Sequence, residues 1–344
     1  MALTNPSRLV AKNLDLFAGQ SLLILNPDSD ELPTLIAKQD CRVTLLSSDL
    51  LTYEALDSLL PSQIHRHFGA DLEALSLPPF DAALIRLPKS KAELLYLTAM
   101  AASQLPPEAP IYWVGDNKGG IRSAGKALAR WVTPPNKVAS GAHCQLLQGH
   151  NLETQPWETN PWWLHHDVTT PDGTLPLASL PGVFGHGTLD QGTRLLLAHL
   201  PQLPQGRVLD FGCGDGIIGA FLARRNPKID LTLVDVSALA LKAAEESLRL
   251  NGCRGRVLAS NGLAKVTGKF DLIVSNPPFH QGRDQSFDVA RRFIQDAANA
   301  LAPGGQLIIV ANQHLPYGED LDRAFGRVNI IGQDNKFKIY ADKK

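Results

Sequence analysis

The chain has 344 residues, of which 44% are hydrophobic and 19% charged, with 33 Lys and Arg against 34 Asp and Glu. At roughly 150 residues per domain this length corresponds to about two domains, and the composition excludes a collagen, a disordered chain and a disulfide-rich miniprotein. A formal net charge of −1 for the whole chain argues against a strongly basic nucleic-acid-binding protein.

Cysteine usage and the amino terminus indicate the cellular compartment. The four cysteines lie far apart without a C-x-x-C pair, so we expect neither a metal site nor a disulfide framework. No cationic stretch followed by an apolar one opens the chain, and no run of 18 apolar residues occurs in it. We therefore expect a reduced cytoplasmic protein with no membrane partner. The cysteines are Cys41, Cys144, Cys213 and Cys253.

The first part of the chain alternates short apolar runs with helical stretches. This alternation is typical of α/β architecture with a largely parallel sheet. Strands are predicted at 21–25, 42–46, 80–85 and 111–114, with a helix over about 92–105.

The stretch 151–181 is rich in Trp, Pro and Thr and has little periodicity. We expect a connector rather than a third core, and expect Trp157, Trp162 and Trp163 to dock it onto a domain rather than to stack on bases. The predicted domains are therefore 1–150 and 182–344.

The last part of the chain has the most regular α/β pattern and predicts a complete doubly wound domain. A turn is expected at 303–305, where the sequence is Pro-Gly-Gly. Strands are predicted at 207–210, 231–234, 270–275 and 306–310, and helices at 217–225, 238–250 and 289–301.

The two predicted domains follow the same order, which indicates an internal repeat. Residues 80–89 align with residues 270–279. The spacing from Asn26 to Phe80 is 54 positions, and that from Gly212 to Phe270 is 58. We therefore predict two tandem Rossmann-like domains that arose by duplication.

A glycine-rich loop follows the strand 207–210. Gly212, Gly214 and Gly216 allow a sharp turn and a close approach of the backbone to a ligand, with the amides of the next helix nearby. Asp235, at the end of the following strand, is placed to accept hydrogen bonds from ribose hydroxyls. The loop predicts a nucleoside site, and by itself leaves both NAD and S-adenosylmethionine open, because 214–219 also fits a dinucleotide fingerprint.

Two features favour S-adenosylmethionine. Asp210 precedes the loop, where a carboxylate suits the methionine ammonium and gives a pyrophosphate nothing. Asn276, Pro277, Pro278 and Phe279 follow the strand 270–275. The Asn276 oxygen and the Pro277 carbonyl can each accept one N–H of an exocyclic amine, which turns the lone pair of the amine toward the methyl group. Pro277 and Pro278 fix the backbone so that the Pro277 carbonyl stays in place, and Phe279 can stack on the base.

These motifs resemble those of a known family, the RsmC family of small-subunit ribosomal RNA guanine-N2 methyltransferases. The resemblance covers nearly the whole chain, since that family also carries a degenerate N-terminal copy of the class I methyltransferase domain. It implies methyl transfer from S-adenosyl-L-methionine to the N2 of one guanosine in 16S rRNA within the 30S subunit. The segments that carry it are 181–185, 189–193, 210–216, 234–240 and 270–282.

The resemblance also implies roles for individual residues. Asn276 and Pro277 would orient the guanine N2, with Pro278 and Phe279 completing the catalytic motif, and Asn261 would reach the adenine amine. Phe184 and Asp190 are interpreted as covering the cofactor. The implied cofactor-binding residues are Asp210, Gly212, Cys213, Gly214, Gly216, Asp235, Val236, Asn261, Gly262 and Asn276.

The first copy lacks this chemistry. Residues 26–30, Asn-Pro-Asp-Ser-Asp, replace the glycine loop, and residues 86–89, Arg-Leu-Pro-Lys, stand where Asn-Pro-Pro-Phe would be. A proline and bulky side chains obstruct close backbone approach, and no amide or aromatic group remains for a base. We predict that this copy binds no cofactor and supports RNA docking or the fold of the catalytic domain.

Counting charge by halves removes the objection to RNA. Residues 1–170 carry 13 Lys and Arg and 17 Asp and Glu, a net of −4, whereas residues 171–344 carry 20 and 17, a net of +3. We expect a monomer that depends on a shaped site more than on bulk attraction to phosphate.

The alternatives to a 16S rRNA guanine-N2 methyltransferase are a 23S rRNA or protein-glutamine methyltransferase, a noncatalytic ribosome-assembly factor and an NAD oxidoreductase. Candidate phosphate contacts are Arg224, Arg225, Lys228, Arg254, Arg256, Arg291, Arg292, Lys336, Lys338, Lys343 and Lys344.

Overall fold

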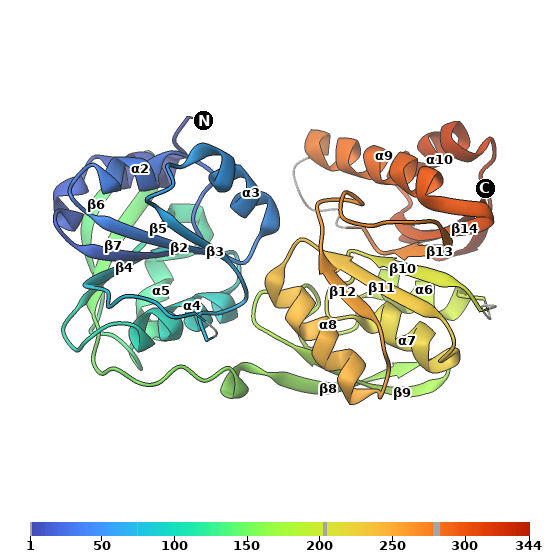
Figure 1. The fold of residues 1–344 in the computed structure, drawn as a ribbon, viewed down its shortest axis with the longest axis horizontal. Helices are drawn as coiled ribbons and strands as arrows, with labels where there is room; N and C mark the ends of the chain where they lie inside the picture. Colours follow the sequence, from blue (N-terminus) through green and yellow to red (C-terminus); the bar gives the residue numbers. More distant parts are fainter. Residues whose placement is uncertain (1, 74, 202–204, 278–282) are drawn as a thin grey trace. The chain divides into compact units, whose positions relative to one another are not determined.

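A computed structural model describes residues 2–73, 75–201, 205–277 and 283–344. The chain forms two compact units, residues 1–162 and 163–344. Each unit has one seven-stranded sheet with helices on both faces (Figure 1). The second unit adds a two-stranded hairpin.

The first unit orders its sheet β3-β2-β1-β4-β5-β7-β6. The pairs from β3 to β5 are parallel, and β7 runs antiparallel to both β5 and β6. The strands are β1 Ser21–Leu25, β2 Arg42–Ser47, β3 His65–Phe68, β4 Ala82–Arg86, β5 Pro110–Asp116, β6 Asn136–Gly141 and β7 Cys144–His150. The helices are α1 Asn5–Ala11, α2 Leu32–Ala37, α3 Leu50–Leu59, α4 Lys91–Ser103 and α5 Ile121–Leu128.

The second unit repeats this order as β12-β11-β10-β13-β14-β16-β15. The strands are β10 Arg207–Phe211, β11 Asp230–Asp235, β12 Arg256–Ala259, β13 Phe270–Ser275, β14 Leu301–Asn312, β15 Ile330–Gln333 and β16 Phe337–Lys343, with the hairpin β8 Leu164–Thr170 and β9 Gly173–Ser179. The helices are α6 Gln191–His199, α7 Ile217–Arg225, α8 Ala238–Leu250, α9 Arg283–Ala300 and α10 Tyr317–Phe325. The repeat predicted from sequence is thus present in the sheet topology.

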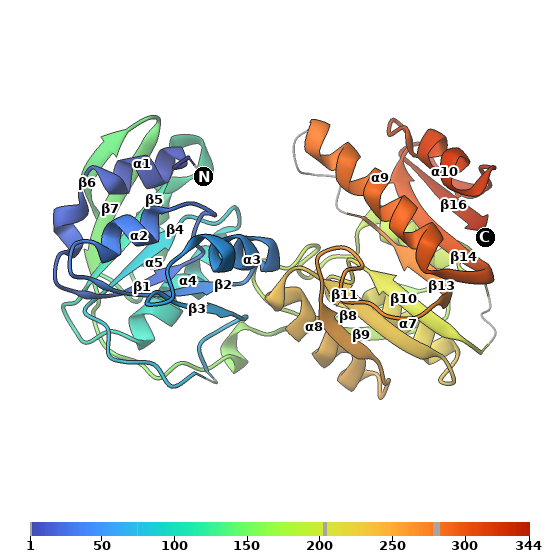
Figure 2. The same cartoon turned by 45° about the horizontal axis from the view of Figure 1, so that its top comes forward.

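The central strands are buried on both faces, as expected of parallel strands covered by helices. All five residues of β1 are buried, and so are the middle residues of β10. In the second unit, α6, α7 and α8 pack on one face of the sheet and α9 and α10 on the other. Figure 2 shows α7 and α8 on one side of the strands and α9 and α10 on the other. No helix within the described ranges is long and apolar enough to cross a membrane.

The boundary between the units lies at Trp162 and Trp163, inside the stretch expected to be a connector. The ring centroid of Tyr96 lies 5.0 Å from that of Trp157 and 5.4 Å from that of Trp162, so aromatic packing ties the start of the stretch to the first unit. Its later part forms β8 and β9, and the hairpin packs on α8 of the second unit. The structure therefore divides the stretch 151–181 between the two units.

The turn expected at 303–305 lies within β14 instead. The ladder between β13 and β14 shifts register there, from Phe270 opposite Leu301 to Leu272 opposite Gln306. A Cβ at Gly305 would lie 2.7 Å from the carbonyl oxygen of Phe270. Glycine therefore allows the bulged strand to stay against its neighbour, and Leu301 belongs to the strand rather than to the preceding helix.

Candidate active site

The parallel strands of the second unit bring the predicted site residues to one edge of the sheet. Phe211 pairs with Val234 of β11 and with Ser275 of β13, so the chain leaves all three strands at the same edge. Open α/β sheets place ligands at this edge. The backbone amides of Gly212 and Cys213 both donate to the Val234 carbonyl, at 2.8 and 3.0 Å, and this fixes the start of the glycine loop on β11.

The three loop glycines have different reasons to be glycine. All have positive φ, +68° at Gly212, +55° at Gly214 and +81° at Gly216. A Cβ on Gly212 or Gly214 would meet nothing within 4 Å, whereas one on Gly216 would lie 2.9 Å from Ala244 Cα. Gly212 and Gly214 therefore face open space that a ligand can fill, and Gly216 permits close packing of α7 on α8.

Asp235 anchors the loop. Its Oδ2 accepts the Gly214 amide at 3.0 Å, and its Oδ1 accepts the Ser237 amide at 2.9 Å. Val236 is half-buried beside it, and Asn261 is exposed, followed by Gly262 at φ +59°. These residues continue the same sheet edge, because β12 runs parallel to β11.

Asp210 lies completely buried beneath the loop. Its Oδ2 accepts the Gly219 amide at 2.8 Å, and its Oδ1 has no partner among the described residues. Burial raises the pKa of Asp210 to about 7, and the charges of Asp235 and Asp215 add to this effect. A buried carboxylate with one unpartnered oxygen is suited to a cationic ligand group.

A pocket lies at this edge of the sheet, and the centre of a water molecule can occupy about 50 Å³ of it. Four of the implied cofactor-binding residues line this pocket: Gly212, Cys213, Gly214 and Asn276. Phe184 and Asp190, which were interpreted as covering the cofactor, line it as well. The remaining predicted cofactor residues, Asp210, Gly216, Asp235, Val236, Asn261 and Gly262, lie outside its lining.

Four polar residues line the pocket that are not among the predicted site residues: Asp215, Thr193, Thr188 and His166. Burial raises the pKa of Asp215 to about 6, with the nearby His166 opposing the shift. Asp215 stands inside the glycine loop, so its position in the motif was the available signal. Thr193 belongs to the segment 189–193 that carries the family resemblance, and His166 belongs to the pair His165-His166, which lacks metal-ligand spacing. The nearness of both residues to the loop depends on the fold. In the part of the chain that the structure describes, no cluster of three or more His, Cys, Asp or Glu has metal-binding geometry.

The Asn276 side chain is held from a distant part of the sequence. Its Nδ2 donates to Asp190 Oδ2 at 3.1 Å and to Thr193 Oγ1 at 2.8 Å. Pro277, the next residue, is buried. Pro278 and Phe279, the other two residues of the predicted catalytic motif, lie outside the described residues.

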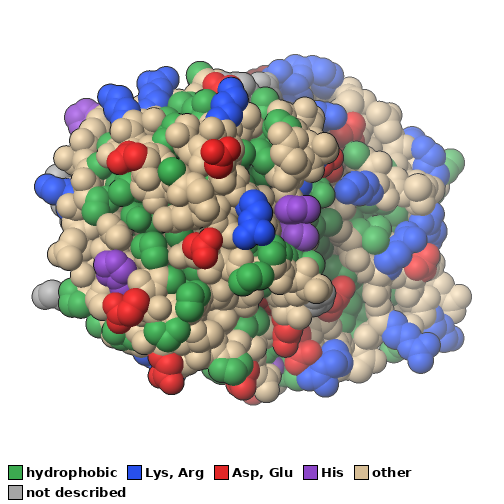
Figure 3. Space-filling model, turned by 60° about the vertical axis from the view of Figure 1, so that its left-hand side comes forward, with side chains coloured by type: hydrophobic (Ala, Val, Ile, Leu, Met, Phe, Trp, Pro, Cys, Tyr) green, Lys and Arg blue, Asp and Glu red, His purple; other side chains and the backbone are tan. Residues whose placement is uncertain are grey.

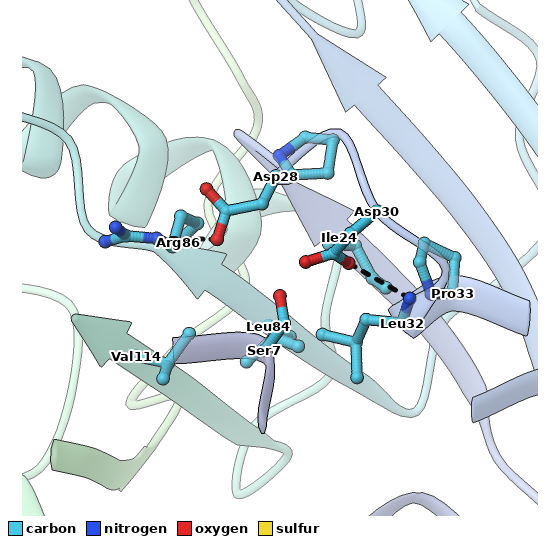
Figure 4. Close-up of a pocket in the computed structure, with 10 residues that line it drawn as sticks. Ser7, Ile24, Asp28, Asp30, Leu32, Pro33, Leu84, Arg86 and Val114 are labelled. Carbon is cyan, nitrogen blue, oxygen red and sulfur yellow. Dashed lines mark hydrogen bonds and ion pairs between the residues drawn. The ribbon is translucent and has the colours of Figure 1, made fainter. Parts of the chain in front are cut away.

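The same edge of the first unit carries different chemistry. The register of β1 with β2 and β4 makes Ile24 equivalent to Asp210, Asn26 to Gly212 and Arg86 to Asn276. The Arg86 guanidinium pairs with Asp28 at 3.0 Å and with Asp116 at 3.2 Å. Figure 4 shows Arg86 and Asp28 directed toward one another at a pocket with about 20 Å³ open to water centres. That volume holds about one water molecule.

Several basic side chains proposed for phosphate are engaged within the second unit. Arg225 pairs with Asp172 and stacks 4.2 Å above the Phe221 ring, and Arg224 donates to the Thr174 carbonyl at 2.7 Å. These contacts hold the β8–β9 hairpin.

Figure 3 shows the side of the molecule on which the first unit comes forward. Acidic, basic and hydrophobic side chains are interspersed on this face.

Both units have a sheet of this strand order, and the second unit also has an open glycine loop and an amide-bearing residue at the carboxyl edge of its sheet. Together these features define a tandem methyltransferase fold whose first copy is degenerate. Residues 7–166 match the family model for the methyltransferase small domain N-terminal region, and residues 174–341 match that for the methyltransferase small domain.

Full-length relatives narrow the class. The chain is 40% identical to the ribosomal RNA small subunit methyltransferase C of Shewanella loihica and 40% identical to that of Shewanella amazonensis, with 99% of this chain and of each relative covered. The chain belongs to the ribosomal RNA small subunit methyltransferase C family.

A solved structure has the same fold over the full length of the chain. It is the T. thermophilus 16S rRNA N2 G1207 methyltransferase in complex with AdoMet and guanosine, which matches with a TM-score of 0.84 at 23% identity. The match covers 99% of this chain and 92% of that one.

Proposed function

We propose that this protein transfers a methyl group from S-adenosyl-L-methionine to the exocyclic N2 of a specific guanosine in 16S rRNA of the 30S subunit. One observation carries the proposal. Both amide hydrogens of Asn276 are engaged by Asp190 and Thr193, so its Oδ1 is the polar atom left for a substrate amine. The shared family with full-length relatives named for small-subunit ribosomal RNA supports the choice of RNA.

The residues of the second unit fit the cofactor. Gly212 and Gly214 leave open space where side chains would obstruct a ligand, and the unpartnered Asp210 Oδ1 suits the methionine ammonium. Asp235 is proposed to meet the ribose, and Asn261 the adenine amine. When bound, S-adenosylmethionine supplies an electrophilic methyl group on its sulfonium.

The chain's own residues prepare the acceptor. The N2 lone pair of guanine is delocalised into the ring, and the amine is therefore a poor nucleophile. Asn276 Oδ1 and the Pro277 carbonyl each accept one N–H, which turns the lone pair toward the methyl group. A strong general base is unnecessary, because the methylated amine is acidic. Pro278 and Phe279 are proposed to fix the backbone and to stack on the guanine.

The first unit is proposed to bind no cofactor. Asn26 and Arg86 occupy the positions of the loop glycine and the catalytic amide, and Arg86 is held in an ion-pair network. This unit is proposed to support RNA docking or the fold of the second unit. We place the protein in the cytoplasm, acting as a monomer on 30S subunits.

The substrate is tested by offering tritiated S-adenosylmethionine with naked 16S RNA, 30S subunits, 50S subunits and protein release factors, followed by nucleoside and amino-acid analysis. The expected product is labelled N2-methylguanosine from 30S subunits alone. Label in 23S RNA or in glutamine, or no label at all, contradicts the proposal.

A further inference from the structure

We propose that Asp190 and Thr193 are positioning residues that hold the Asn276 amide with its oxygen facing the methyl acceptor, an inference that rests on the proposed function. Asp190 Oδ2 and Thr193 Oγ1 lie 3.1 and 2.8 Å from Asn276 Nδ2. All three residues line the pocket at the carboxyl edge of the sheet. Asp190 and Thr193 precede Asn276 by 86 and 83 positions, so only the fold brings them to it.

The chemistry of these partners selects one of two amide orientations. A half-turn about the last side-chain bond exchanges the oxygen and nitrogen of an asparagine amide at nearly unchanged shape. An ionised carboxylate accepts hydrogen bonds and donates none, so the nitrogen must face Asp190. The Asn276 oxygen then faces the other way. In the reverse orientation the amide nitrogen would meet a substrate amine, and two donors form no hydrogen bond.

The start of α6 holds the two positioning residues in place. Asp190 is the N-cap of α6, and its Oδ2 also accepts the Thr193 amide at 3.0 Å. Thr193 is only 5% exposed. One carboxylate oxygen therefore joins the helix start to Asn276, so that a rigid element fixes the amide.

The first unit also has a helix N-terminus at this edge of its sheet, so the contacts of the two helix N-terminal ends can be compared. There α1 precedes the first strand as α6 does, and its N-cap Thr4 donates to Asp28 Oδ2 at 2.7 Å. Asp28 in turn pairs with Arg86, the residue equivalent to Asn276. Both units thus connect a helix N-cap to the residue at the carboxyl end of an equivalent strand, Arg86 in β4 and Asn276 directly after β13, but only in the second does this connection leave an acceptor atom for a substrate.

The first experiment separates helix capping from amide positioning. Asp190→Ser keeps an N-cap hydroxyl but is too short to reach Asn276, and Thr193→Val keeps the shape but removes the hydroxyl. We expect kcat to fall about 10- to 100-fold for Asp190→Ser and about 10-fold for Thr193→Val, with the melting temperature of both variants nearly unchanged. For Thr193→Val the KM for S-adenosylmethionine should also be nearly unchanged. Thr193→Ser should restore most of the kcat lost in Thr193→Val. Ser7→Ala, at the matched position of α1, is the control.

A reciprocal exchange tests the direction of the hydrogen bond. Asn276→Asp places two carboxylates together and removes the donor, so activity should be lost. Adding Asp190→Asn to that variant returns a donor to the pair, with a carboxylate oxygen left for the substrate. The double variant should recover at least about tenfold in kcat over Asn276→Asp alone. A double variant no better than Asn276→Asp would overturn the inference.

A measurement that needs no RNA separates this inference from the proposed function. The side-chain amide signals of Asn276 in a ¹⁵N-labelled protein are assigned by their loss in Asn276→Ala. We expect Thr193→Val to shift one of them and to speed its hydrogen exchange, with no change in Ser7→Ala. Unchanged Asn276 signals in Thr193→Val contradict the positioning role. If the signals shift as expected but no N2-methylguanosine forms on 30S subunits, the proposed substrate is wrong and the amide orientation stands.

Discussion

The first and second units place equivalent residues at the same edge of the same kind of sheet. Asn26 and Gly212 both donate their backbone amide across to the neighbouring strand, to Leu46 at 3.1 Å and to Val234 at 2.8 Å, and both have positive φ. The two edges differ in their side chains, because one unit has an ion-pair network around Arg86 and the other an open glycine loop. The same kind of sheet thus accommodates an ion-pair network or an open glycine loop at its carboxyl edge. A few residues at the strand ends decide whether that edge can hold a ligand.

The largest effect should come from Asn276. Asn276→Ala removes the amide proposed to orient the acceptor and should lower kcat by about 10³-fold or more. The Kd for S-adenosylmethionine should change little, because the other implied cofactor-binding residues are retained. Calorimetry measures the Kd, and tritium transfer to 30S subunits measures kcat. The matched variant in the first unit, Arg86→Ala, should leave kcat unchanged. Loss of cofactor binding in Asn276→Ala would contradict the role assigned to this residue.

The next effect concerns the open loop. Gly212→Val combines a branched side chain with a φ of +68° and fills space proposed for the cofactor, so affinity for S-adenosylmethionine should fall about 100-fold. Asn26→Gly, at the equivalent position of the first unit, should leave the stoichiometry at one cofactor per chain. Two bound cofactors in calorimetry of the unaltered protein would abolish the distinction between the units.

A smaller effect depends on pH through Asp210, whose counterpart in the first unit is the apolar Ile24. The folded-state pKa of Asp210 is raised to about 7, so the carboxyl loses its charge as the pH falls through 7. Affinity for a cofactor ammonium should therefore fall as the pH drops below about 7, by up to about tenfold per unit. Calorimetry at several pH values checks this, and Asp210→Asn should flatten the profile.

The same raised pKa has the opposite sign for stability. Between pH 4 and pH 7 the folded state holds a proton on Asp210 that the unfolded state releases, so this group's contribution to the free energy of unfolding decreases as the pH rises through that range. In the absence of cofactor, Asp210→Asn should raise the melting temperature at pH 8. A lowered melting temperature there would show that the ionised carboxylate is satisfied by the protein.

The smallest effect lies in the first unit. Arg86→Ala leaves Asp28 and Asp116 without their cation, and the side chains of Arg86 and Asp28 are only 21% and 22% exposed. We expect the free energy of unfolding to fall by about 1–2 kcal/mol, measured by urea denaturation. Lys89→Ala serves as a control for loss of charge. An unchanged midpoint would mean that the network does not stabilise this unit.

The central strands and several helices could be predicted because their signals are local. The structure has α7 and α8 at the predicted bounds, and β1 and β13 also agree, since each is a continuous apolar run or a clear helical stretch. The strands that were not predicted include β6 and β15. Both are edge strands with mainly exposed residues, so neither has the apolar pattern by which a strand is recognised.

The tandem organisation, and the position of the glycine loop and of the Asn-Pro motif at one edge of the sheet, could be inferred from the amino-acid sequence. Each is carried by neighbouring residues, and parallel strands bring their carboxyl ends to one edge. Other features depend on the folded chain: Gly216 serves helix packing, Arg86 holds an ion-pair network, and Asp190 and Thr193 hold the Asn276 amide. These contacts join residues far apart in the chain. Their geometry is set by how the layers pack, which no local pattern specifies.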